Sequence, residues 1–174
     1  MLNVLVAFAT KHHATEGIAQ AIGRAIEEPG VIRADVRPAD TVTEVRSYDA
    51  AIIGSAVYIG RWQGSAVDLL VNFESDLRNR PVWLFSSGPT GEGDPTDILE
   101  GWEMPETLRA IAQRIGVRES VVFHGKLDPA DLNLLERMTV HMVKAPLGDY
   151  RDWGAIHAWA LDIKQALKVL APEQ

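Results

Sequence analysis

The chain has 174 residues, of which 47% are hydrophobic and 24% charged, and its formal net charge at neutral pH is −7. This length suits one well-packed core, and the composition is ordinary for a globular domain. The negative charge argues against nucleic acid as a partner. The lack of cysteine excludes disulfides and thiolate metal ligands.

Five segments have the pattern of strands. Residues 2–9 are nearly all apolar, which is typical of a central parallel strand covered on both faces. Residues 31–37 alternate apolar and charged side chains, which indicates a half-exposed edge strand. The other three candidates are residues 50–57, 82–85 and 120–123. Strands that alternate with helices predict a doubly wound α/β sheet, and we expect a single domain over residues 1–174.

Helical periodicity fills the gaps between these strands. It follows Gly64 and Pro105, and it is clearest in the last helix, which begins near Trp153. A further helix is expected over residues 129–144, where four apolar residues are spaced along one face, namely Leu132, Leu135, Met138 and Met142. The charges of this helix are balanced, so it has no basic face for a membrane surface. We therefore expect it to pack on the core or to form an oligomer contact, such as a homodimer.

The first strand runs through a short loop straight into a helix. Thr10 and Thr15 bracket the loop residues Lys11, His12, His13 and Ala14. A helix start leaves about four backbone N–H groups unpaired and carries a partial positive charge, so this loop is a candidate phosphate site. It is neither a Walker loop nor a dinucleotide fingerprint. The alternative is an ordinary turn of an α/β protein.

Two later loops complete the candidate site, because doubly wound sheets bind ligands at the carboxyl ends of their strands. Residues 54–62 and 85–91 follow apolar strands and consist largely of small residues, hydroxyls and glycines. Such loops let the backbone approach a flat ligand closely. Tyr58 and Trp62 add aromatic surface that can stack on a ring. The alternative roles are loop packing for Tyr58 and anchoring of the next helix for Trp62.

The first loop resembles the phosphate loop of the flavodoxin family, in which hydroxyl residues flank a glycine. Thr10 and Thr15 occupy the outer hydroxyl positions, whereas His12 stands at the middle hydroxyl and His13 at the glycine. Over its whole length the chain is similar to the menaquinone-dependent protoporphyrinogen dehydrogenase branch, including residues 53–58 and the segment 148–153 before the last helix. The resemblance implies a flavodoxin-like sheet in the order 2-1-3-4-5 with helices on both faces.

The resemblance further implies non-covalently bound FMN. Its phosphate would be held by Thr10, Lys11, His12, His13, Ala14 and Thr15, and its isoalloxazine would be flanked by Ser55, Ala56, Val57 and Tyr58 on one side and Ser86, Ser87 and Gly88 on the other. The Val57–Tyr58 peptides would lie near the reacting edge. No catalytic side chain is expected, because the flavin carries the chemistry, and no metal site is expected.

The implied function is that of an FMN-dependent oxidoreductase with a porphyrinogen-like donor and a quinone-like acceptor. One alternative is an electron carrier that docks a redox partner protein. Another is a domain that has lost FMN through His12 and His13, whose rings either add charge beside the phosphate or only offer their backbone N–H groups. The first nine residues are strand-length and no apolar run reaches about 20 residues. We therefore expect a cytoplasmic protein with no integral membrane segment.

One stretch without Lys or Arg, residues 81–108, holds six carboxylates, namely Glu92, Asp94, Asp97, Glu100, Glu103 and Glu106. Beside a flavin this charge would lower the reduction potential and suit a basic partner, but a solvated acidic loop is the alternative. Trp102 in the same stretch either covers the flavin ring or anchors the loop to the helix that follows Pro105. His124, His141 and His157 lack metal-ligand spacing.

Overall fold

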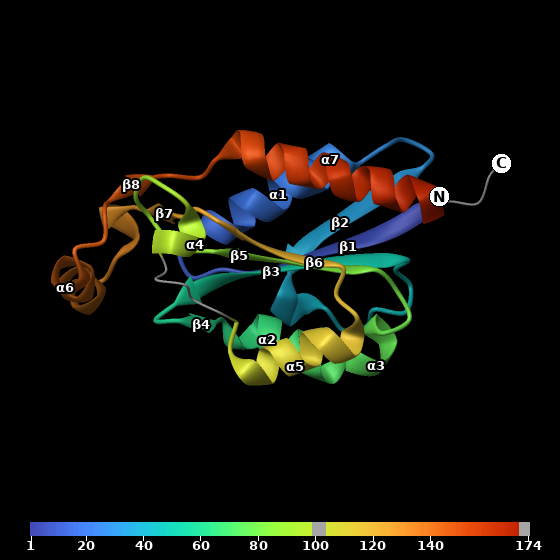
Figure 1. Cartoon of the computed structure of the whole chain (residues 1–174), viewed down its shortest axis with the longest axis horizontal. Helices are drawn as coiled ribbons and strands as arrows, with labels where there is room; N and C mark the ends of the chain where they lie inside the picture. Colours follow the sequence, from blue (N-terminus) through green and yellow to red (C-terminus); the bar gives the residue numbers. More distant parts are fainter. Residues whose placement is uncertain (99–103, 171–174) are drawn as a thin grey trace.

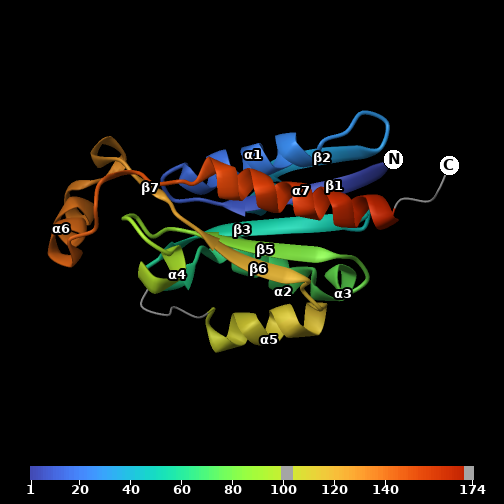
Figure 2. The same cartoon turned by 45° about the horizontal axis from the view of Figure 1, so that its top comes forward.

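A computed structural model describes residues 1–98 and 104–170 of the chain. The strands and helices form three layers (Figure 1), with a parallel sheet between α1 and α7 on one face and α2, α3 and α5 on the other. The sheet has the order β2-β1-β3-β5-β6, so the predicted order of its five strands is confirmed. The view in Figure 2 shows the helices α1 and α7 lying side by side over it.

The five strands of this sheet are β1 (Leu2–Ala9), β2 (Ile32–Pro38), β3 (Ala50–Tyr58), β5 (Val82–Ser87) and β6 (Glu119–Phe123). All pair in parallel. The half-exposed pattern of β2 arises because it lies at the edge of the sheet, beside β1. A short strand, β4 (Arg61–Trp62), pairs antiparallel with β3, and a two-residue ribbon joins β7 (Lys126–Leu127) to β8 (Gly148–Asp149). The sequence pattern predicted neither of these short pairs.

The helices are α1 (Ala14–Ile26), α2 (Gly64–Asn72), α3 (Glu74–Leu77), α4 (Pro95–Ile98), α5 (Glu106–Ile115), α6 (Leu134–Val143) and α7 (Trp153–Leu170), with 3₁₀ turns η1 (Ala39–Thr41) and η2 (Pro129–Asp131). The helices α1, α2, α5 and α7 each bury one stripe against the sheet. In α7 the buried stripe is Ile156, Ala160, Ile163 and Leu167, as its spacing by three and four predicts.

Alternate side chains of the central strands fill two cores. Val4, Val6 and Phe8 of β1 face α1 and α7, whereas Leu5 and Ala7 face α2 and α5. Every one of these side chains is at most 6% exposed. A strand with both faces covered has no solvent-facing positions, which is why residues 2–9 read as a continuous apolar run rather than an alternating one.

The predicted single helix over residues 129–144 is wrong in two respects. Asn133 interrupts it as the N-cap of α6, with its side chain accepting the backbone N–H of Glu136, so Leu132 lies outside the helix. Core packing is wrong too, because Leu135, Met138 and Met142 are 73%, 59% and 79% exposed. Figure 1 shows α6 projecting beyond the carboxyl ends of the strands. The helix therefore contributes to the region where ligands bind rather than to the core.

Candidate cofactor cleft

The loop between β1 and α1 presents a helix N-terminus and an unpartnered hydroxyl. Thr10 Oγ1 is buried and has no hydrogen-bond partner among the residues that the structure describes. His13 precedes the first residue of α1 in the left-handed conformation, with φ of 59°. Its exposed ring contacts Glu16, with Nδ1 2.9 Å from Oε2. The backbone therefore has a positive φ at the position where the family's loop has glycine, although a histidine occupies it.

The loop before α1 (the first loop) and the loop after β5 (the fourth loop, residues 85–91) are joined by a buried hydrogen bond. Thr15 Oγ1 lies 2.8 Å from Ser87 Oγ, and both residues are almost fully buried. The two residues are 72 positions apart in the chain. This bond fixes the start of α1 to the end of β5. The hydroxyl of Thr15 is thus satisfied within the protein, in contrast to that of Thr10.

The third loop is a tight hairpin between β3 and β4. Ile59 and Gly60 at its tip both have positive φ, 49° and 68°, which is the conformation of a type I′ turn. Ser55 lies below the tip and is fully buried. Its Oγ accepts the backbone N–H of Gln63 at 2.8 Å and donates to the carbonyl of Ala56 at 3.0 Å. The Ser55 hydroxyl therefore shapes the loop from beneath.

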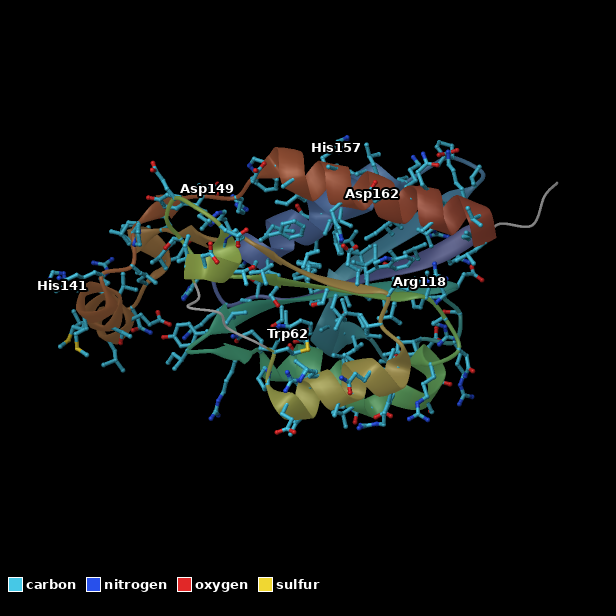
Figure 3. The ribbon with its side chains drawn as sticks, in the orientation of Figure 1. Trp62, Arg118, His141, Asp149, His157 and Asp162 are labelled. Carbon is cyan, nitrogen blue, oxygen red and sulfur yellow. The ribbon has the colours of Figure 1, made fainter. Side chains whose placement is uncertain are left out.

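Trp62 is an anchor under the sheet. Its Nε1 donates to Ser86 Oγ at 2.9 Å, and the ring is 5% exposed within the α2 and α5 core. Figure 3 shows Trp62 in the layer below the sheet. Of the two roles weighed for Trp62, anchoring is the one that fits this burial. Ser86 is 1% exposed and its hydroxyl serves this bond.

The third and fourth loops approach each other so closely that only glycine fits at position 88. A Cβ added to Gly88 would lie 2.9 Å from the carbonyl oxygen of Val57. Gly125, from the segment after β6, packs equally closely, since its Cβ would lie 3.1 Å from the backbone of Gly88. Three backbones thus meet at the carboxyl end of the sheet.

A cleft of about 660 Å³ opens where these loops meet, within the usual size of small-molecule sites. Ten of the residues expected at the site line it, namely Thr10, Lys11, His12, Ala14, Thr15, Ala56, Val57, Tyr58, Ser87 and Gly88. The other three do not line it: the ring of His13 is exposed, and Ser55 and Ser86 are buried beneath the loops. The cleft is open to solvent and its lining is mostly apolar.

The far wall of the cleft was not anticipated. It comes from the segment after β6 and from α6, and includes Lys126, Leu127, Leu132, Glu136, Thr139 and Val140. The sequence holds one local signal for part of it, an Asn-x-x-Glu capping box at Asn133 and Glu136. That signal fixes the start of a helix, but not which way the helix faces.

A charged cluster bridges the cleft. Lys11 Nζ lies 2.8 Å from Glu136 Oε1 and 3.3 Å from the centroid of the Tyr58 ring. Partial burial acts to lower the pKa of Lys11, but hydrogen bonding to Glu136 and Tyr58 outweighs it and raises the pKa. The same contact with Lys11, together with the backbone N–H of Asn133, lowers the pKa of Glu136. Both groups are therefore charged at neutral pH.

His12 points toward the same carboxylate. Its Nε2 lies 3.5 Å from Glu136 Oε1, which is too long for a good hydrogen bond, and this nitrogen is buried without a hydrogen-bond partner in the described part of the chain. The carboxylate of Glu136 is nonetheless close enough to attract this ring when it is protonated. The Thr10 hydroxyl, which has no such neighbour among the described residues, fits a polar ligand at this loop.

The acidic stretch lies beside the cleft. Glu92, Asp94, Asp97 and Glu106 are exposed, and Ile98 from the same segment lines the cleft. Asp94 accepts the backbone N–H of Thr96 at 2.7 Å, which lowers its pKa. Glu100, Trp102 and Glu103 lie outside the described residues, so the alternatives for Trp102 stay predictions.

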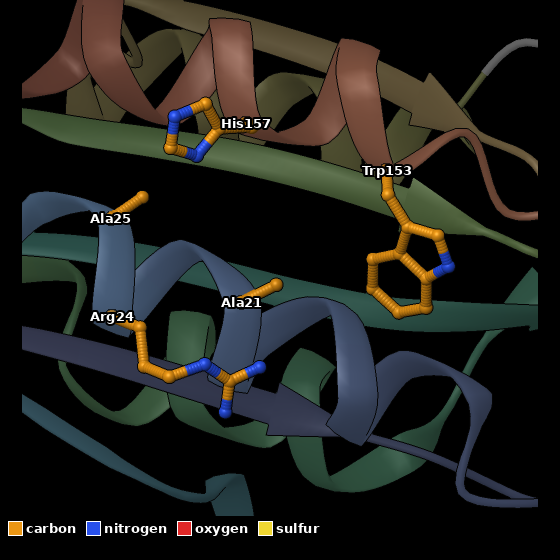
Figure 4. A pocket seen from close by; sticks show the side chains of 5 residues that line it. All are labelled: Ala21, Arg24, Ala25, Trp153 and His157. Atoms are coloured by element: carbon orange, nitrogen blue, oxygen red, sulfur yellow. The ribbon is translucent and has the colours of Figure 1, made fainter.

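Outside the cleft, an open groove of about 420 Å³ lies between α1 and α7 (Figure 4), lined by Ala21, Arg24, Ala25, Trp153 and His157. It holds none of the expected site residues. In the described ranges no group of three His, Asp or Glu side chains is placed to hold a metal ion. No helix within residues 1–98 and 104–170 has the length and apolarity needed to cross a membrane.

Comparisons with known proteins agree with this geometry. A family model described as a flavodoxin domain matches residues 5–153. Rubredoxin oxygen:oxidoreductase from Desulfovibrio gigas shares 14% identity at a TM-score of 0.62, over 96% of this chain but 36% of that one. A flavodoxin from the domain Archaea shares 14% identity at a TM-score of 0.59, over 96% of this chain and 99% of that one.

A mutant flavodoxin from Pseudomonas aeruginosa is similar to the same extent, with 15% identity and a TM-score of 0.57 over 96% of this chain and 99% of that one. At such low identities these structures show a shared fold. No curated protein sequence matches the chain significantly.

Proposed function

Because the chain belongs to the flavodoxin domain family, we propose that it is a redox protein that binds FMN in the cleft above β1, β3 and β5. The family and the flavodoxin neighbours support FMN as the cofactor. The observation that carries the proposal is the buried Thr10 Oγ1 at the loop before α1, which has no hydrogen-bond partner among the described residues. A phosphate oxygen would accept a hydrogen bond from this hydroxyl.

The residues present fit the cofactor at both ends. The first-turn N–H groups of α1 and the Thr10 hydroxyl would hold the phosphate. The backbones of residues 56–58 and 87–88, which pack tightly because position 88 has no side chain, would flank the isoalloxazine. The bound flavin supplies the electron-transfer chemistry. The chain's own residues would bind, orient and partly desolvate it.

We favour an oxidoreductase acting on a small molecule over a carrier, because the cleft extends past the three loops to a further wall from α6 and the segment before it, in which Leu132 and Val140 lie beside polar side chains. That wall gives a second flat molecule a surface beside the flavin. A porphyrinogen-like donor and a quinone-like acceptor rest on the sequence resemblance alone. An assay with a soluble quinone as acceptor and candidate donors, with and without FMN, tests this choice.

An electron carrier is the second candidate, supported by the exposed carboxylates Glu92, Asp94 and Asp97, whose segment reaches the cleft at Ile98. Such a surface attracts a basic redox partner, and the transfer rate then falls as salt is added. Turnover of small molecules at a rate independent of ionic strength would favour the enzyme. Salt-dependent reduction by a partner reductase, without small-molecule turnover, would favour the carrier.

FMN binding itself is tested by the visible spectrum of the purified protein and by titration of the apoprotein with FMN. Saturable quenching of flavin fluorescence at low micromolar FMN is the expected result. The matched variant is Thr10→Val, which removes the unpartnered hydroxyl and keeps the side-chain shape. Weaker binding of FMN by Thr10→Val, with unchanged binding of riboflavin, would support the phosphate seat. A wild-type protein that ignores FMN would refute the proposed function.

A further inference from the structure

Lys11 belongs to the loop before α1, yet its ammonium group is held at the opposite side of the cleft. It lies 3.3 Å over the ring of Tyr58, at the end of β3, and 2.8 Å from Glu136 Oε1 on α6. A cation that contacts both a ring face and a carboxylate is attracted by both. Three elements that are far apart in the chain thus fix one positive charge at the mouth of the cleft.

Glu136 is itself held rigidly, so the cation has a fixed partner. Its Oε2 accepts the backbone N–H of Asn133 at 3.0 Å, and its own N–H donates to Asn133 Oδ1 at 2.9 Å. One carboxylate oxygen therefore anchors the start of α6 and the other binds Lys11. The side chains of Lys11 and Glu136 are 31% and 10% exposed, so the pair is largely shielded from solvent and its field is weakly screened.

We propose that the Lys11–Glu136 ion pair sets the reduction potential of the bound flavin, with Lys11 serving the isoalloxazine rather than the phosphate. The inference rests on the proposed binding of FMN. Its warrant is the position of the ammonium on Tyr58, the side chain expected to flank the ring. Reduction adds electron density to the ring, and a fixed cation nearby stabilises the electron-rich form more than the oxidised form. Glu136 offsets part of that effect.

The decisive measurement compares dissociation constants for oxidised and reduced FMN in charge-removing variants. In Lys11→Met the cation is lost and the Glu136 carboxylate loses its lysine partner, so reduced FMN loses about tenfold in affinity relative to oxidised FMN. A tenfold change in the ratio of the two dissociation constants lowers the midpoint potential of a two-electron couple by about 30 mV. Glu136→Gln can keep the capping box and removes the negative charge beside Lys11. It therefore shifts the ratio of the dissociation constants for reduced and oxidised FMN in the opposite direction. The double variant recovers most of the shift.

The matched control is an ion pair of the same length outside the cleft. Lys168 Nζ on α7 lies 2.8 Å from Glu28 Oε2. Lys168→Met and Glu28→Gln remove the same charges from the protein as a whole, so they report the effect of net charge alone. Both variants are expected to leave the ratio of the two FMN dissociation constants within about twofold of wild type.

Riboflavin and inorganic phosphate separate the two roles of Lys11. If Lys11 serves the ring, Lys11→Met shifts the oxidised-to-reduced ratio equally for riboflavin and FMN and leaves phosphate binding unchanged. If Lys11 serves the phosphate, Lys11→Met weakens the binding of FMN and of inorganic phosphate, but leaves riboflavin binding and the midpoint potential unchanged. That result would overturn this inference while the proposed binding of FMN stands. A wild-type protein that binds neither flavin overturns the proposed function, and this inference with it.

Discussion

Gly54 lies in the middle of β3 between two phenylalanines, in register with Phe8 on β1 and Phe85 on β5. A Cβ at this position would lie 2.0 to 2.3 Å from three carbons of the Phe85 ring, where an ordinary carbon contact is about 3.5 Å or more. The Gly54→Ala variant must therefore displace the ring by more than an ångström.

The ring has little room to move. Phe85 is fully buried, and its centroid lies 6.2 Å from those of both Phe123 and Trp159. The indole of Trp159 is fixed in turn, because its Nε1 donates to Glu119 at 2.8 Å. Overpacking of a tight core usually costs about 1–3 kcal/mol. We expect Gly54→Ala to lie at the upper end, with a loss of about 3 kcal/mol in the free energy of unfolding.

A double-mutant cycle with Phe85→Leu tests this explanation. The single Phe85→Leu variant loses ring contacts and should cost about 1–2 kcal/mol. If the clash is the cause, the double variant costs at least about 1 kcal/mol less than the sum of the single variants. Unfolding in urea measures all three. A Gly54→Ala protein whose free energy of unfolding lies within about 0.5 kcal/mol of wild type would refute the reasoning. Losses of the two single variants that simply add in the double variant would refute it as well.

Three further predictions concern other parts of the fold. Burial, and then the hydrogen bond to Asp35, raise the pKa of Tyr48 from 10.0 to about 12. The neutral phenol therefore contributes its full stabilisation of the folded state below pH 10 and loses it as the pH rises to about 12. Urea unfolding should show the difference in free energy of unfolding between wild type and Tyr48→Phe shrinking over this pH range. The free energy of unfolding of His13→Gly should lie within about 1 kcal/mol of wild type, because relief of the positive φ offsets the added freedom of the unfolded chain. That of His13→Val should be lower by about 1–2 kcal/mol. Equal effects of the two variants would contradict the idea that the backbone is strained at this position. Met138→Glu on the exposed face of α6 should change the free energy of unfolding by less than about 0.5 kcal/mol, against about 2–5 kcal/mol for Ile156→Ala in the core. The homodimer stays a prediction. If sedimentation shows that Met138→Glu is more monomeric than wild type, the contact between the two copies lies on α6.

The strands and helices of the layered sheet could be predicted because their signals are local, whereas the order of the strands came from the family resemblance. Continuous apolar runs mark the central strands, and alternation marks β2 at the edge. The loop before α1 was also recognised from consecutive residues, since strand, loop and helix follow each other directly. Hydrophobic periodicity likewise predicted the buried stripe of α7.

The role of each hydroxyl at the site could not be predicted from residue type. Thr10, Thr15, Ser55 and Ser86 are equivalent candidates in the sequence, yet only the Thr10 hydroxyl is buried without a partner in the described part of the chain. The others bond to Ser87, Gln63 and Trp62. Which hydroxyl is free depends on contacts across the sheet, and such contacts leave no trace in local composition.

The sequence by itself thus determined the alternation of strands and helices, the loop between the first strand and the first helix, and the resemblance to the flavodoxin family, because hydrophobic spacing and short motifs are read over a few residues. The tertiary structure alone decided that α6 stands outside the core as a wall of the cleft, and that Lys11 meets Glu136 over Tyr58. An apolar stripe on a helix predicts burial only if another element covers it. A contact between residues 11 and 136 exists only because the chain returns to the carboxyl end of the sheet after β6.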